Sequence, residues 1–153
     1  MYEKILVPLD GSKVGEAALP YVEDMVSKLS PKVKVEVTLL QVLPPTSVYL
    51  GGGEVPREAV YTKEVMEETT GKAMEYLNKI GETLRSKGVI VTAKVSVGNA
   101  AEEIKKAADE LNVDLIAMST HGRSGIRRWA FGSITDRVLR SENKPILMVR
   151  ASK

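Results

Sequence analysis

Cysteine is absent from the 153 residues of this chain, and histidine occurs only once, as His121. Without cysteine the chain forms no disulfide bond and offers no thiolate to a metal ion or to a redox reaction. A single histidine also falls short of the histidine clusters that typical metal hydrolases use to bind zinc. Disulfide cross-links, thiol chemistry and metal hydrolysis of the usual kind are therefore excluded.

Strong charge, aromatic surface and long apolar runs are lacking as well. The 22 basic and 20 acidic residues leave a net charge of +2, and aromatic residues make up 5% of the chain. Nucleic-acid binding depends on basic surfaces and on aromatic side chains that stack on bases, so nucleic acid is not an expected partner. No apolar run approaches the roughly 20 residues that span a bilayer, and no apolar signal segment precedes the first strand. We expect a cytoplasmic protein without membrane contact.

The apolar pattern predicts five strands and four helices in alternation. The strands are expected at residues 4–9, 33–42, 89–97, 114–118 and 145–149. The helices are expected at residues 12–29, 56–87, 99–111 and 134–140, the last with positions 134 and 138 on its apolar face. Pro20 predicts a bend or break in the first helix, because proline cannot donate the helical hydrogen bond. Gly88 and Asn99 predict a helix stop and a helix N-cap.

Strands that alternate with helices predict an α/β fold, a doubly wound parallel sheet with helices on both faces, within one domain of residues 1–153. The strand at 89–97 alternates along its length, as an edge strand does, whereas those at 4–9 and 114–118 are apolar throughout and suit the centre. The strand order 3-2-1-4-5 satisfies both patterns. In such sheets ligands bind where the order reverses, here at the carboxyl ends of strands one and four.

Residues 118–133 connect the fourth strand to the last helix and carry the most distinctive pattern in the chain. The connection is rich in glycine and hydroxyl residues and contains three arginines. Glycine lets the backbone approach a ligand closely, and the free N–H groups at a helix start favour negative charge. These features predict a phosphate-binding loop at the place that the strand order selects.

The spacing of this loop resembles the nucleotide-binding signature of the universal stress protein family. That signature has glycine, two residues, glycine, nine residues, glycine, and then serine or threonine. Gly122, Gly132 and Ser133 match it, whereas Ser119 replaces the first glycine. The resemblance extends to the opening residues 5–12, to Gln41-Val42, to the turn at Gly98 and to the closing residues 144–149.

The resemblance implies ATP as the ligand, with magnesium held through the phosphates. It places the adenosine among residues of the first and second strands, where Asp10 has the chemistry to accept hydrogen bonds from ribose hydroxyls. A simpler interpretation makes Asp10 a cap of the first helix or turn. The ribose and triphosphate are expected along the signature, and Arg123 is a candidate phosphate contact. The predicted cofactor-binding residues are Pro8, Leu9, Asp10, Val42, Met118, Ser119, Gly122, Arg123, Gly132, Ser133 and Ile134.

No catalytic group is expected in this site. The segment Gly122–Gly125 lacks one residue of a nucleophile elbow, and no spacing sets a carboxylate and a serine around His121. We therefore expect a regulatory or stress-response protein that hydrolyses ATP slowly or not at all. Two alternatives stay open: a dimeric partner-binding protein that binds no ATP, for which Ser119 is the argument, and a binder of AMP or cyclic AMP.

The last strand predicts a homodimer. Residues 146–149 are apolar throughout, yet the expected order places them at a sheet edge. An edge of this kind exposes unpaired backbone groups beside apolar side chains, and pairing with a second copy satisfies both. Members of the family that the chain resembles also dimerise through this strand.

Overall fold

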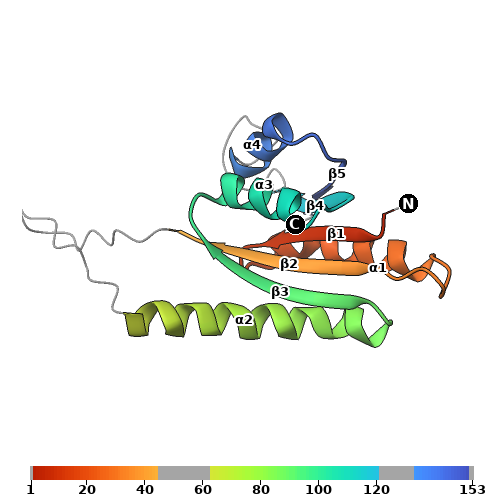
Figure 1. Cartoon of the computed structure of the whole chain (residues 1–153), viewed down its shortest axis with the longest axis horizontal. Helices are drawn as coiled ribbons and strands as arrows, with labels where there is room; N and C mark the ends of the chain where they lie inside the picture. The colour runs from red at the N-terminus through yellow and green to blue at the C-terminus, as the bar shows by residue number, and fades with distance from the viewer. Residues whose placement is uncertain (1, 45–62, 121–132, 152–153) are drawn as a thin grey trace, which may run out of the picture.

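The computed structural model describes residues 2–44, 63–120 and 133–151, and its centre is a parallel sheet (Figure 1). The sheet has five strands in the order β3-β2-β1-β4-β5, which confirms the predicted order. The first strand also has its predicted bounds. The strands are β1 Lys4–Leu9, β2 Glu36–Leu43, β3 Ile90–Val97, β4 Leu115–Thr120 and β5 Ile146–Arg150.

The helices begin and end where local signals in the sequence dictate. A short 3-10 turn precedes α1, and Pro20 lies in the first turn of α1, where its missing N–H costs no hydrogen bond. Gly88, with a φ of +82°, follows the end of α2. The Asn99 side chain accepts a hydrogen bond from the Glu102 N–H at the start of α3. The elements are η1 Gly15–Ala18, α1 Leu19–Ser27, α2 Lys63–Ser86, α3 Ala100–Glu110 and α4 Ser133–Ser141.

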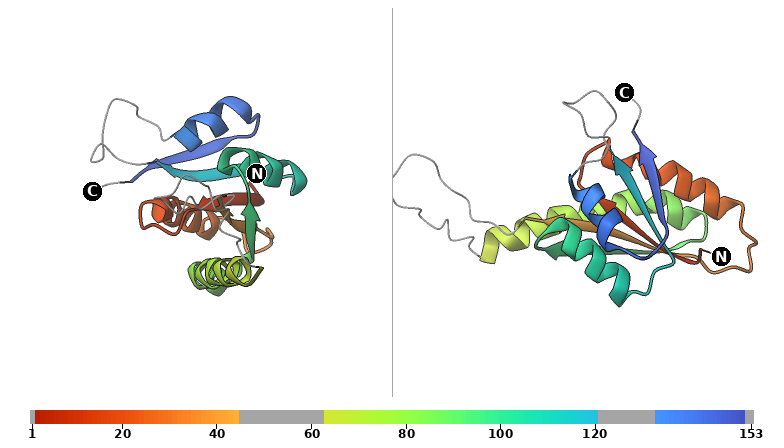
Figure 2. Two further views of the ribbon diagram at one scale, coloured as in Figure 1. Left: turned by 90° about the vertical axis from the view of Figure 1, so that its left-hand side faces the viewer. Right: turned by 90° about the horizontal axis from the view of Figure 1, so that it is seen from above.

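The two faces of the sheet bury separate apolar cores, because successive side chains of a strand point to opposite faces. Ile5 and Val7 of β1 pack with Leu77 of α2 and with residues of α1. Leu6, on the opposite face, packs with Ile104 of α3 and with Val138 of α4. The helices therefore cover the sheet in pairs, α1 with α2 and α3 with α4 (Figure 2). None of the helices in the described ranges is long and apolar enough to cross a bilayer.

Three local predictions were wrong. The second strand starts at Glu36, since Val33 still belongs to a turn in which its N–H bonds to Ser30 O at 2.8 Å. The fourth strand continues two residues beyond the predicted end, through Ser119 and Thr120. On α4 the buried residues are Thr135 and Val138, whereas Ile134 is 44% exposed. The part of the predicted long helix before residue 63 lies outside the described residues.

Asp114 anchors the N-terminus to the start of β4. Its Oδ2 accepts hydrogen bonds from the N–H groups of Lys4 at 2.9 Å and Glu3 at 3.1 Å. The bond from Lys4, assisted by the bond from Glu3, holds the pKa of this carboxyl below its ordinary value. A depressed pKa means stability that is present above the unfolded-state pKa and is lost as pH falls through the folded-state pKa.

We therefore expect Asp114→Ala to lower the free energy of unfolding by about 1 kcal/mol at pH 7, a value that allows for solvent exposure. The difference from the wild type should shrink as the pH falls from about 4, the ordinary pKa of an aspartate, through the lower pKa of the folded Asp114 carboxyl. Urea unfolding between pH 2.5 and 7 measures this. Asp24→Ala, which removes an exposed ion pair with Lys28 on α1, is the matched control and should change little. A deficit that does not depend on pH would contradict the role of the Asp114 charge.

Candidate functional site

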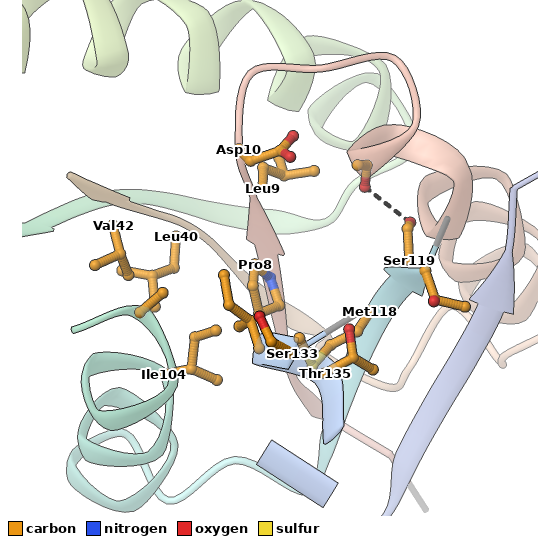
Figure 3. Close-up of a pocket in the computed structure, with 14 residues that line it drawn as sticks. Pro8, Leu9, Asp10, Leu40, Val42, Ile104, Met118, Ser119, Ser133 and Thr135 are labelled. Carbon is orange, nitrogen blue, oxygen red and sulfur yellow. Dashed lines mark hydrogen bonds between the residues drawn. The ribbon is translucent and has the colours of Figure 1, made fainter. Parts of the chain in front are cut away.

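A cavity of about 300 Å³ opens at the carboxyl ends of β1 and β4 (Figure 3). This is the point where the strand order reverses, and diverging connections leave a crevice there. Eight of the eleven predicted site residues line the cavity. They are Pro8, Leu9, Asp10, Val42, Met118, Ser119, Ser133 and Ile134. The other three, Gly122, Arg123 and Gly132, lie outside the described residues, as does His121.

The cavity has an apolar wall on the side of α3. Leu40 and Val42 come from the end of β2, Ile104 from α3, and Met118 from the end of β4. Figure 3 shows these side chains around one hollow, with Pro8 of β1 between them. A flat apolar group of the size of a nucleobase fits such a wall, since ligand pockets are mostly apolar with a few fixed polar groups.

Asp10 supplies a carboxylate at the rim, directly after β1. Its Oδ1 accepts hydrogen bonds from the N–H and the hydroxyl of Ser12, the first of them at 2.9 Å. The hydrogen bonds that described residues make to the Asp10 carboxylate all end on Oδ1, and none of these residues engages Oδ2. Asp10 therefore caps the turn at Ser12 through Oδ1, whereas neither η1 nor α1 has a side-chain cap at its start. A binding role for Oδ2 is compatible with this turn.

Gly15 lies against this carboxylate and could not be replaced by a larger residue without moving it. A Cβ atom at Gly15 would collide with Asp10 Oδ1. The Gly15 N–H in turn donates to Ser12 Oγ at 3.0 Å. The turn from Asp10 to Gly15 thus holds the carboxylate in one position through hydrogen bonds and close packing.

The sequence analysis missed two threonines in the cavity. Thr120 is 3% exposed, and its hydroxyl oxygen has no hydrogen-bond partner among the described residues, although the residue lines the cavity. Thr135, buried in the first turn of α4, also lines it. A buried hydroxyl without a partner is costly, so Thr120 marks a place where a polar ligand atom would be favourable. Its position one residue after Ser119 in the signature was the only signal in the sequence.

Ser119 needs no glycine-like backbone here. Among the described residues other than glycine, a positive φ occurs only at Asn112. Ser119 instead continues β4 in extended conformation. Its hydroxyl points toward Gly15, as the dashed line in Figure 3 marks. The departure from the signature at this position therefore causes no backbone strain in the strand.

The helix η1 beside the cavity is also tied to α2. The Tyr76 hydroxyl donates to Glu16 Oε1 at 2.9 Å. Burial, the hydrogen bond to Glu16 and the negative charges of Glu16 and Asp10 raise the pKa of Tyr76 well above its usual value. The tyrosine therefore stays a protonated donor at neutral pH and adds no charge near Asp10.

A second hollow adjoins the cavity and shares Val42, Ala100, Ser133 and Ile134 with it. Both α3 and α4 begin at its wall, and Arg137 of α4 lines it. Free N–H groups at helix starts, together with an arginine, favour negative charge. An extended ligand in the cavity would therefore meet favourable surroundings for an anionic end on this side.

Known proteins are similar to this chain over nearly its whole length. A model of the universal stress protein family matches residues 1–150. The universal stress protein MJ0577 of Methanocaldococcus jannaschii is 32% identical, over 98% of this chain and 96% of its own length. The solved structure of MJ0577 superposes with a TM-score of 0.79, at 31% identity, and covers 100% of this chain and 99% of that one.

Two more distant structures share the fold and contain bound nucleotides. A universal stress protein in complex with cAMP superposes with a TM-score of 0.64 at 17% identity, covering 99% of this chain and 98% of its own. A family protein from Arabidopsis thaliana with AMP bound superposes with a TM-score of 0.66 at 14% identity, covering 97% of this chain and 92% of its own.

Proposed function

Because this chain belongs to the universal stress protein family, we propose that it binds ATP in the cavity at the ends of β1 and β4 and acts in regulation or the stress response. The observation that carries the proposal is the convergence in one cavity of residues from three separate segments of the chain. These segments are the end of β1, the end of β2, and the signature that runs from β4 to α4.

Each part of ATP has a counterpart in the site. The apolar wall of Leu40, Val42 and Ile104 suits the adenine ring, and we assign the backbone groups at Val42 to its edge. Asp10 Oδ2 is available to ribose hydroxyls. The start of α4 at Ser133 and the adjoining hollow with Arg137 favour the phosphates. We assign Gly122, Arg123 and Gly132 to the same phosphate region on the strength of the signature.

Magnesium would accompany the phosphates and supply charge neutralisation there. Within the described part of the chain, no group of three histidine or acidic side chains is placed to hold a metal ion. The carboxylate nearest the cavity, Asp10, is engaged through Oδ1 with Ser12. We therefore propose that the cation is bound mainly by phosphate oxygens, as magnesium in nucleotide sites often is.

AMP and cyclic AMP are the alternative ligands, because two structures of the same fold contain them. The feature that favours ATP is the second hollow, which continues the cavity past Ser133 toward Arg137. An adenosine monophosphate would leave this anion-favouring region empty. Competition between ATP, AMP and cyclic AMP in one titration would rank the three ligands.

We expect saturable binding of one ATP per chain and slow turnover of the bound nucleotide. We assign Asp10, the one carboxylate among the described residues that line the cavity, to the ribose rather than to water, so turnover should remain below about one per second, the low end of typical enzymes. Isothermal titration with magnesium-ATP and a phosphate-release assay measure both quantities. Absence of binding to any adenine nucleotide would favour the alternative of a partner-binding protein, and faster turnover would make the protein an enzyme.

We also propose that the protein is a homodimer paired through β5. This strand lies at the sheet edge beside β4, and its outer side has no neighbour among the described strands. Ile146, Leu147 and Met148 remain partly exposed there although they are apolar. Antiparallel pairing with the same strand of a second copy would cover them and would satisfy the free backbone groups.

A further inference from the structure

Two serine hydroxyls hold Gly15 from opposite ends of its backbone. The Gly15 N–H donates to Ser12 Oγ at 3.0 Å, and the Gly15 carbonyl accepts from Ser119 Oγ at 2.8 Å. Ser12 then donates its own hydroxyl to Asp10 Oδ1. A continuous series of hydrogen bonds therefore links Ser119, on the signature strand β4, to the carboxylate at the rim of the cavity.

Ser119 also accepts a hydrogen bond from the Ala18 N–H at 2.9 Å. Gly15 C=O and Ala18 N–H are the pair of groups that a 3-10 turn joins directly. The Ser119 hydroxyl bridges this pair and uses both its donor and its acceptor capacity. Because each bond crosses about a hundred residues of sequence, the hydroxyl fixes η1 against β4 rather than stabilising a local turn.

We propose that Ser119 is a positioning residue that sets the Asp10 carboxylate for the ribose hydroxyls of a bound nucleotide. The inference rests on the proposed nucleotide function. Ser119 acts through Gly15, which leaves no room for a Cβ beside Asp10 Oδ1 and whose N–H donates to Ser12. Holding Oδ1 in this way fixes the plane of the carboxylate, and with it the position of Oδ2 at the cavity rim. Glycine, which the family signature has at this position, would supply neither of the two bonds that Ser119 makes.

The test compares ATP with 2′,3′-dideoxy-ATP, which lacks the ribose hydroxyls. Wild type should bind ATP about 10-fold more tightly than the dideoxy compound, the range expected for a hydrogen bond to a charged group. Ser119→Ala and Ser119→Gly should lose most of this preference, while their affinity for the dideoxy compound stays within about 2-fold. Restoring the signature glycine should therefore weaken ATP binding.

The preference for ATP is a robust readout because it is a ratio. A variant that is partly unfolded lowers the measured affinities for both ligands by the same factor, so the ratio is unchanged. A purely structural role of Ser119 would reduce both affinities equally. Ser27→Ala is the matched control, since its hydroxyl donates to Asp24 O at the far end of α1 and should leave the ratio at its wild-type value.

A double-mutant cycle completes the test. In the Asp10→Ala background, Ser119→Ala should cause no further loss of ATP affinity, because the group that it positions is gone. Additive losses, or an ATP preference that survives in Ser119→Ala, would overturn the inference. If the wild type binds neither nucleotide, the proposed function itself fails. If the wild type prefers ATP and the Ser119 variants keep the same preference, the inference about Ser119 fails while the proposed function stands.

Discussion

Val42→Trp should weaken ATP binding by at least about 100-fold, because an indole placed in the cavity occupies the volume proposed for the adenine ring. Val42 is the second-last residue of β2 and lines both the cavity and the adjoining hollow. The side chain is only half-buried. Free space in front of it can therefore accept the larger ring without displacement of the core, and the variant should stay folded.

The control for this variant is Ile90→Trp. Ile90 is 50% exposed and begins β3, at the amino ends of the strands and away from the cavity. It should bind ATP like the wild type. Thermal unfolding of both variants within a few degrees of the wild type would show that folding is intact. Wild-type affinity in Val42→Trp would mean that the nucleotide binds elsewhere on the protein.

The strand order could be predicted from the sequence because burial and periodicity are coupled in α/β sheets. A strand that is covered on both faces, such as β1, must be apolar at nearly every position, and Ile5, Leu6 and Val7 are all fully buried. The edge strand β3 keeps an alternation at its start, with Ile90 and Thr92 exposed and Val91 and Ala93 half-buried. These patterns are local in sequence, so they can be recognised without knowledge of tertiary contacts.

The role of Ser119 could not be predicted in this way. Its two partners are backbone groups of Gly15 and Ala18, which are about a hundred residues away in sequence and meet β4 only in the folded chain. The sequence shows that Ser119 departs from the signature, but it does not show which groups the serine hydroxyl bonds to. The burial of Thr120 could not be predicted either, because it depends on the extension of β4 to this residue, beyond the predicted strand end.

The orientation of Ile134 shows a different limit. The spacing of Ile134 and Val138 placed both on the apolar face of the last helix, yet only Val138 is buried. Thr135, three residues before Val138, takes the inward position of the first turn. A helix of nine residues has few turns, so a small rotation decides which side chains face the core. Ile134 then lies at the cavity, where an apolar side chain can cover a ligand.

Met148→Pro should convert the proposed dimer into a monomer. In a parallel ladder, alternate residues of a strand bond to the same neighbour. Ile116 N–H bonds to Pro145 O, and Ala151 N–H bonds to Thr120 O, so the odd-numbered residues of β5 direct their N–H groups to β4. The N–H of Met148 therefore faces the free edge. Proline at Leu147 would damage the sheet itself, whereas proline at Met148 removes only a donor of the proposed interface.

The substitution occurs twice in a two-fold dimer, so the dissociation constant should rise by about 100-fold or more. Sedimentation equilibrium at micromolar concentration should give twice the chain mass of 16.7 kDa for the wild type and the single mass for Met148→Pro. Met148→Ala keeps the N–H group and should remain dimeric. A monomeric wild type would exclude β5 as the interface. So would a dimer that survives Met148→Pro with its thermal stability unchanged, because a paired edge cannot tolerate the loss of a central donor and the bulk of the pyrrolidine ring.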